Sequence, residues 1–161
     1  MLSKDLKVPV PIYVKKYLES EFGLDEQGRV FANQASILGR ILNTVVVDCP
    51  YPVVYDNVQG SLVTIRFMYR SKSACVPKRK VEELSNLLRG LFDVALISEA
   101  RAVHGIVGRY DKAVFGFLTR YGIEIDVDIQ EDTARSIYRN YLERIEKKRQ
   151  KGGNFENIYA Q

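Results

Sequence analysis

The sequence has no tryptophan, one histidine and two cysteines, and these scarcities exclude several kinds of site. A structural zinc site needs about four Cys or His ligands, which Cys49, Cys75 and His104 cannot supply. His104 has no nucleophile near it in the sequence, so we expect it in a loop or at a helix end rather than in a catalytic centre. We therefore expect a protein that is not an enzyme and holds no metal or cofactor.

Long apolar runs are also missing. No run approaches the ~18 apolar residues of a membrane span, and the first residues, MLSKDLKVPVP, lack the apolar core of a secretory signal. Neither a P-loop nor a dinucleotide-binding fingerprint occurs, so we expect no small-molecule ligand. We expect a cytoplasmic protein that does not bind membranes. In that setting Cys49 and Cys75 should be reduced thiols, and a disulfide between them is the alternative.

What is present is typical of one folded domain: 161 residues, of which 46% are apolar and 27% charged. The apolar periodicity predicts an α+β fold, with a small mixed N-terminal half of helices and a short antiparallel sheet, and an all-helical C-terminal half. We place the mixed region at residues 1–77, a helical bundle at residues 78–151 and a flexible tail at residues 152–161.

In the N-terminal half, prolines, glycines and alternating apolar residues mark the elements. The expected order is an edge strand at 6–10, a helix at 12–22 ended by Gly23, a strand at 29–31, a helix at 34–44 capped by Asn33, a strand at 44–49, and a hairpin of 53–55 with 62–70 around 56–60. Strand, helix, helix also begins a ribbon-helix-helix unit, whose strand reads DNA. Because this strand would offer little beyond Lys7, we favour a helical pair packed on a sheet.

The C-terminal half carries the clearest helical pattern. We expect helices at 79–103 and 112–121, the second with Asp111 as N-cap and Gly122 just after its end. A third helix starts near Ile129 with Asp128 and Glu131 as a capping box. Its apolar stripe is Ala134, Ile137, Tyr138, Tyr141, Leu142 and Ile145. Helix, glycine turn, helix outlines a helix-turn-helix, although the seven residues 122–128 exceed the usual 3–4-residue turn.

Charge is segregated along the chain. The net charge is +4, yet residues 133–151 hold seven Lys or Arg and two Glu, and residues 70–80 hold five Lys or Arg and no acid. Such segregation favours a polyanionic partner. We expect duplex DNA to face Arg135, Ser136, Arg139 and Asn140, with phosphates contacted by Arg120, Arg144, Lys147, Lys148, Lys78, Arg79 and Lys80. The alternatives are a solvated helix face with i,i+4 pairs through Glu143, and single-strand stacking on Tyr138 and Tyr141.

A family resemblance rests on recurring positions in the larger part of the chain. They are Tyr110, Asp111, Ala113 and Val114, then Phe117, Leu118, Tyr121, Gly122 and Ile123, the acidic stretch with Asp126, Asp128 and Ile129, the Tyr-rich basic helix at 138–148, and Val10, Val14–Leu18, Phe22 and Gly23 near the start. This pattern resembles small proteins of bacterial phages and mobile elements with a helix-turn-helix-like C-terminal part. The resemblance implies a DNA-binding role and supplies no functional residues.

Two other functions stay open. A phage structural or assembly protein, acting as an oligomeric adaptor, could use its basic faces on acidic partner surfaces. A nuclease would need carboxylates for a metal, and Asp126 and Asp128 could share a strand face, but no paired acid and base accompanies them. We therefore favour DNA binding, with a homo-oligomeric adaptor as the alternative.

Overall fold

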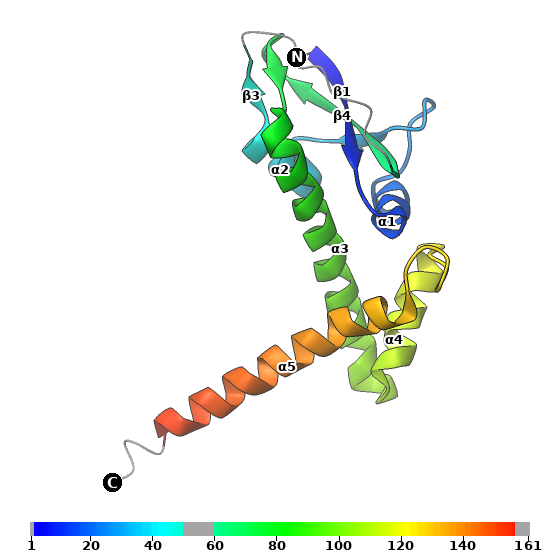
Figure 1. Cartoon of the computed structure of the whole chain (residues 1–161), viewed down its shortest axis with the longest axis vertical. Coiled ribbons are helices and arrows are strands. Elements are labelled where there is room, and N and C mark those ends of the chain that lie inside the picture. The colour runs from blue at the N-terminus through cyan, green and yellow to red at the C-terminus, as the bar shows by residue number, and fades with distance from the viewer. Residues whose placement is uncertain (1, 50–59, 157–161) are drawn as a thin grey trace. The chain divides into compact units, whose positions relative to one another are not determined.

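The computed structural model describes residues 2–49 and 60–156, and it confirms the α+β class. The expected hairpin strand at 53–55 lies outside the described residues. The elements are β1 Leu2–Pro9, α1 Ile12–Phe22, β2 Val30–Ala32, α2 Ile37–Val45, β3 Val47–Asp48, β4 Leu62–Tyr69, β5 Ala74–Cys75, α3 Lys78–Val107, α4 Tyr110–Arg120 and α5 Glu131–Glu156 (Figure 1). They form two compact units, Met1–Phe92 with Tyr121–Ile123, and Asp93–Arg120 with Glu124–Gln161.

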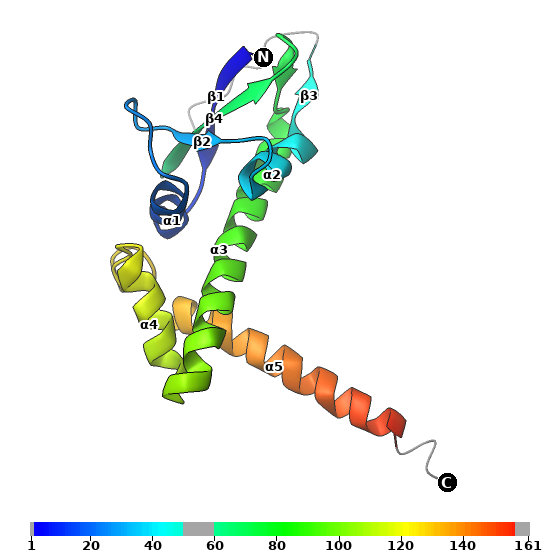
Figure 2. The same ribbon diagram turned by 180° about the vertical axis from the view of Figure 1, so that it is seen from behind.

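The first unit is built on a three-stranded sheet with the order β1-β4-β2 (Figure 2). β1 pairs with β4 antiparallel, with Leu6 opposite Ile65, whereas β2 pairs with β4 parallel. The sheet is therefore mixed rather than wholly antiparallel. The expected strand at 62–70 is confirmed, since Val63, Ile65 and Phe67 are buried on one face. As expected, β1 is an edge strand, although it is longer than residues 6–10.

Helix α1 has the bounds that the sequence predicts. Pro11 stands at its N-cap, and Gly23 follows its last residue with φ +74°, a conformation that costs glycine little. Val14, Tyr17 and Leu18 are buried. A proline before the first turn and a glycine after the last one thus mark both ends of this helix correctly.

Helix α2 starts later than expected. The Asn33 side chain accepts the N–H of Ala35 in a turn, and the true N-cap is Ser36, whose hydroxyl accepts the Gly39 N–H at 3.1 Å. The expected strand at 44–49 is also shorter, because α2 continues to Val45, which is fully buried. Val46 is extended as the C-cap of α2, and only Val47–Asp48 pairs as a strand.

Cys49 and Cys75 form a disulfide, so the expectation of two reduced thiols is wrong. The antiparallel β3–β5 pair sets Val47 opposite Cys75, and the Cys49 N–H donates to Ser73 O at 2.8 Å. This pairing leaves the two Cα atoms 5.9 Å apart, within the range that a disulfide spans. The sequence spacing of the cysteines does not show that the two strands pair.

Helix α3 is longer than residues 79–103 and contributes to both units. Leu84, Leu88 and Phe92 are buried in the first unit, where the rings of Tyr13 and Phe92 lie 4.9 Å apart. The Ser85 hydroxyl donates to Pro9 O at 2.6 Å. The division between the units therefore falls after Phe92, rather than after residue 77. The helix then continues past its expected end to Val107, before Gly108 with φ +72°.

The second unit contains the rest of α3 with α4 and α5. Helix α4 starts at Tyr110, so Asp111 lies in its first turn, paired with Arg109 at 2.6 Å, and is not the N-cap. Gly122 has φ +63°, as its place after α4 predicts. The expected capping box at Asp128 and Glu131 is wrong.

The loop before α5 uses its aspartates on its own backbone. Asp128 accepts the Glu124 N–H at 2.8 Å, while Asp126 accepts the Glu131 N–H at 3.2 Å, and α5 begins at Glu131. The helix runs to Glu156, so the first five residues of the expected tail are helical. Residues 157–161 lie outside the described residues.

Candidate nucleic-acid interface on helix α5

The first half of α5 is held by an aromatic cluster in the second unit. Ala134 and Tyr138 are buried, and the Tyr138 ring lies 5.7 Å from His104, 6.1 Å from Tyr110 and 5.8 Å from Tyr141. The Tyr138 hydroxyl and His104 Nδ1 are 3.1 Å apart, at hydrogen-bond distance. Burial raises the pKa of Tyr138, and the neighbouring Tyr141 adds to the shift. His104 thus lies near the α3 end, as expected, and helps to anchor α5.

Arg135 is bound within the unit and does not stand free toward a groove. Its Nη2 lies 2.6 Å from Glu131 Oε1, and its guanidinium carbon lies 5.2 Å from the centre of the Phe115 ring. The Ser136 hydroxyl donates to Thr133 O at 2.8 Å. Arg135 and Ser136, two of the four side chains expected to face the DNA groove, are therefore engaged in contacts within the protein.

The exposed cations lie further along the helix, in what we call the basic segment (residues 139–151). From Glu143 to Lys151 every side chain is exposed except Ile145, which is half-buried. In the described parts of the chain no ion-pair partner is found for its cations, which are Arg139, Arg144, Lys147, Lys148, Arg149 and Lys151. With Glu143 and Glu146 the basic segment has a net charge of +4. Figures 1 and 2 both show this part of α5 running clear of α4.

The basic segment includes two cations, Arg149 and Lys151, that the sequence-based site omitted. The charge run from Lys147 onward is the signal that could have identified both. Asn140 is exposed beside Arg139, as expected.

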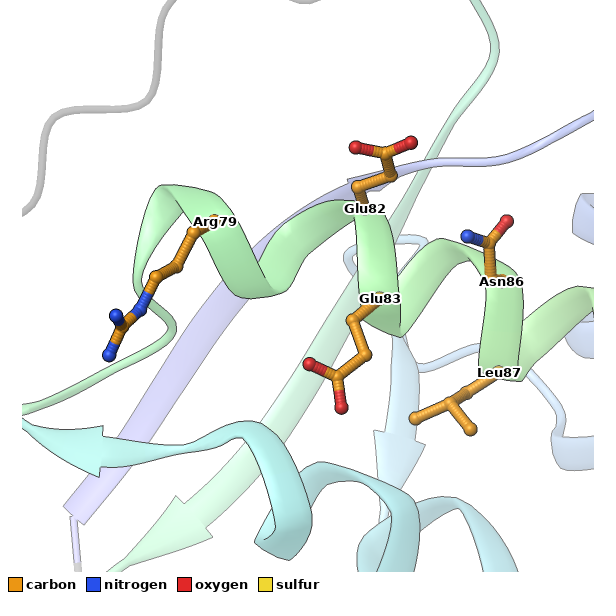
Figure 3. Close-up of a pocket in the computed structure, with 5 residues that line it drawn as sticks. All are labelled: Arg79, Glu82, Glu83, Asn86 and Leu87. Carbon is orange, nitrogen blue, oxygen red and sulfur yellow. The ribbon is translucent and has the colours of Figure 1, made fainter.

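The other expected phosphate contacts are residues outside the basic segment, and several of them have ion-pair partners of their own. Arg120 pairs with Glu99 at 2.7 Å in the second unit. Lys78, Arg79 and Lys80 begin α3 in the first unit, where Lys80 pairs with Glu83 at 3.0 Å. Arg79 lines a shallow depression of about 460 Å³ with Glu82, Glu83, Asn86 and Leu87 (Figure 3). Because two carboxylates share that surface, it is a weaker anion site than its sequence suggests.

The α4–α5 pair departs from a helix-turn-helix in two respects. Ten residues separate Arg120 from Glu131, against the usual 3–4. A recognition helix also contacts bases with its N-terminal residues, whereas α5 begins with Glu131 and Asp132. Residues 124–132, which we call the acidic segment, hold five acids and no base. Any contact with DNA therefore falls on the basic segment rather than on the start of α5.

A groove lies beside the half-exposed part of the apolar stripe. It has a volume of about 470 Å³ and is lined by Arg101, Tyr138, Tyr141, Leu142, Ile145, Glu146 and Arg149. Tyr141, Leu142 and Ile145 are only half-buried, so the stripe continues beyond the contacts of its own unit. Among residues 2–49 and 60–156, no group of three or more His, Cys, Asp or Glu could hold a metal ion.

No protein-family model matches the chain, and comparison with curated proteins and with solved structures yields no match. Within the described ranges no helix is both long and apolar enough to cross a membrane. The class of partner must therefore be inferred from the geometry and charge of the chain itself.

Proposed function

We propose that the protein binds duplex DNA through the basic segment of α5, chiefly by contacts to phosphates. The observation that supports this is the row of six cations of the basic segment, which are all exposed and have no ion-pair partner among the described residues. A helix with its side chains is about 10–12 Å across, and the DNA major groove is about 12 Å wide. The basic segment therefore fits along or within that groove.

The side chains of the basic segment favour affinity over sequence discrimination. Lys and Arg on phosphates position a protein without reading sequence, whereas Arg and Asn can also hydrogen-bond to base edges. In the basic segment, Arg139 and Asn140 are the only adjacent Arg and Asn, and both side chains are exposed. Glu143 and Glu146 reduce the net positive charge. We expect binding that depends strongly on salt and weakly on sequence.

The same proposal includes an origin in a phage or mobile element and a location in the bacterial cytoplasm. A phage or mobile-element protein that binds duplex DNA would act in the cytoplasm of a bacterial host. Cytosolic disulfides are uncommon, and the Cys49–Cys75 disulfide would be one of them. It lies in the first unit, and the basic segment does not depend on it.

Fluorescence anisotropy on labelled duplexes tests the proposal. The full chain is titrated against duplexes of two unrelated sequences between ~50 and ~200 mM salt, where each neutralised phosphate adds about 0.9 to the negative slope of log K against log salt. Four to six contacts predict a slope of about −4 to −5 on both duplexes. Absence of binding at ~50 mM salt would overturn the proposal.

An oligomeric adaptor is the second candidate, and one observation favours it. Tyr141, Leu142 and Ile145 keep part of their apolar surface in solvent beside a groove of about 470 Å³. Half-exposed apolar stripes that border a groove mark protein contacts. Light scattering on the purified chain distinguishes a large assembly from a small oligomer.

A further inference from the structure

The groove beside the apolar stripe of α5 is lined by an accessible aromatic ring. Tyr138 and Tyr141 both line it, and their rings stack with centres 5.8 Å apart and 27° between their planes. Tyr138 is buried, whereas Tyr141 is only half-buried. The volume of about 470 Å³ is within the range of small-ligand sites. A flat ligand that enters the groove can therefore reach the ring of Tyr141.

The rest of the lining combines positive charge with apolar surface. Arg101 comes from α3 and Arg149 from α5, and both are exposed without an ion-pair partner among the described residues. Glu146 is the one acid of the lining, so two arginines less one glutamate leave a net charge of +1. Leu142 and Ile145 supply the apolar surface. A ring, apolar surface and guanidinium groups suit a nucleobase joined to its phosphate.

Tyr141 lies on the same side of α5 as cations of the basic segment. Arg144 and Lys148 are three and seven positions after Tyr141, and these spacings set the three side chains on one side of a helix. Arg149 belongs both to the basic segment and to the lining of the groove. A DNA strand whose phosphates contact Arg144 and Lys148 would therefore pass beside the groove.

We propose that the groove takes one unpaired base of the bound DNA, which stacks on the ring of Tyr141 while neighbouring phosphates contact Arg144 and Lys148. This inference rests on the proposed function and narrows its ligand to DNA with a single-stranded end or an unpaired base. A base inside an intact duplex is stacked between its neighbours and has to leave the helix before it presents its face. Because every base has a π-face, the site selects an unpaired base rather than a sequence.

Other occupants satisfy less of the lining. An apolar helix of a partner would cover Leu142 and Ile145, but it would bring the guanidinium groups of Arg101 and Arg149 against apolar surface, where charged groups lose hydration. An acidic peptide would suit the arginines, but it would be repelled by Glu146 and would gain nothing from the apolar residues. A nucleotide offers a planar apolar face together with a negative charge, as the lining requires.

Fluorescence anisotropy on three labelled DNAs tests the groove. All contain the same duplex: one is blunt, one has a short single-stranded overhang, and one has an overhang of equal length made of abasic residues. The two overhangs carry the same number of phosphates, so their comparison isolates the bases. The wild type should bind the overhang with bases about tenfold more tightly, within the range for one base stacked on an aromatic ring. Equal affinity for the two overhangs overturns the proposal.

The ratio of the two overhang affinities also separates stacking from charge. It should stay the same between ~50 and ~200 mM salt, because salt screens phosphate contacts and not stacking. A ratio that disappears at the higher salt concentration would show that the bases act only through charge, and this result overturns the proposal.

A variant without the ring tests the role of Tyr141. Tyr141→Leu keeps an apolar side chain, removes the ring and should bind the two overhangs equally. The matched control is Tyr69→Leu, at a half-buried tyrosine of β4 in the first unit, which should keep the wild-type ratio. Circular dichroism checks that both variants are folded. A folded Tyr141→Leu variant that keeps the full ratio overturns the proposal, and if this variant does not fold, the abasic comparison on the wild type decides.

The inference and the proposed function fail separately. Binding of the blunt duplex without preference for the overhang with bases would refute the groove alone. Binding of that overhang without binding of the blunt duplex would refute the duplex function alone, and absence of all binding would refute both. Light scattering without DNA examines a second copy of the chain as occupant. A dimer that Leu142→Asn dissociates would assign the groove to a contact between copies and would overturn the inference.

Discussion

Nη2 of Arg135 lies 2.6 Å from the carboxylate of Glu131, one helical turn earlier in α5. The same guanidinium stacks over Phe115 of α4, so it ties the two helices together. Its Nε is buried without a hydrogen-bond partner, so the ion pair with Glu131 and the contact with the Phe115 ring are the interactions that hold this guanidinium. Arg135 is therefore a structural residue, although it belongs to the most basic part of the sequence.

The Arg135→Ala variant should consequently lose stability rather than DNA affinity. Loss of an i,i+4 pair and of a cation–π contact amounts to about 1 kcal/mol in the free energy of unfolding. Arg139→Ala/Arg144→Ala should show the reverse, with unchanged stability and a salt slope smaller by about 2. Urea unfolding and anisotropy on both variants provide the comparison. Equal loss of affinity in both would contradict this division of roles.

Tyr138 should be the most sensitive position on α5. Removing its ring from a buried site in Tyr138→Ala should cost about 3 kcal/mol, whereas Tyr138→Phe, which loses only the contact with His104, should cost about 1 kcal/mol. Tyr141→Phe is the control, because this side chain is half-exposed. Urea unfolding followed by circular dichroism measures all three, and equal effects of the two Phe variants would count against an anchoring role for Tyr138.

Two glycines should respond to alanine in opposite directions. No other group lies within 4 Å of the position of a Cβ at Gly90, so Gly90→Ala should stabilise α3 by up to about 1 kcal/mol. At Gly39 the added Cβ would clash with Asn33 O and meet Gln34 Cα at 2.7 Å, both in the backbone. Gly39→Ala should therefore lower the free energy of unfolding by about 1 to 3 kcal/mol, the usual cost of overpacking. Thermal melts of the two variants check the signs.

Reduction of the Cys49–Cys75 disulfide should destabilise the first unit. The cysteines are 26 positions apart, and loop closure over that length corresponds to about 3.5 kcal/mol in the chain-entropy picture. Urea unfolding with and without dithiothreitol measures the difference, and thiol titration of the unfolded protein confirms the oxidation state. The Cys49→Ser/Cys75→Ser variant is the control and should be insensitive to dithiothreitol. Free thiols in the untreated protein would contradict the disulfide.

Acid should weaken the first unit through Asp25. The Arg29 N–H bonded to its carboxylate lowers the pKa of Asp25 below 3.8, and the Arg29 guanidinium lowers it further. A carboxyl whose pKa is lower in the folded than in the unfolded state stabilises the fold. This contribution is complete above the unfolded-state pKa and is lost as the pH falls through the folded-state pKa. Stability should therefore fall below about pH 4.

Asp25→Asn should flatten this fall, when urea unfolding is compared between pH 6 and pH 3, a range that spans the unfolded Asp pKa of about 3.9. Glu26→Gln, at an exposed neighbouring carboxyl, serves as control and should retain the wild-type pH dependence. If Asp25→Asn keeps the full loss of stability in acid, the ion pair with Arg29 is not its source.

Local rules explain why parts of the fold could be predicted from the sequence. Pro11 and Gly23 define both ends of α1, and alternation identifies β4, because these signals depend on residues adjacent in the chain. The sequence predicts the wrong cap for α2 and the wrong start for α5, because the same residue types that cap helices also form turns. Asn33, Asp126 and Asp128 turn their side chains onto nearby backbone N–H groups, as such residues also do in turns.

The sequence by itself determined the α+β class, the apolar stripe of α5 and the segregation of its charge, since period and composition are properties of the chain. Only the tertiary structure decided which charges are free. Arg135 and Arg139 are equally basic in sequence, but Phe115 and Glu131 hold the first, while the second is exposed. Likewise, only the β3–β5 pairing brings Cys49 to Cys75. Contacts between residues distant along the chain depend on packing, which no local pattern records.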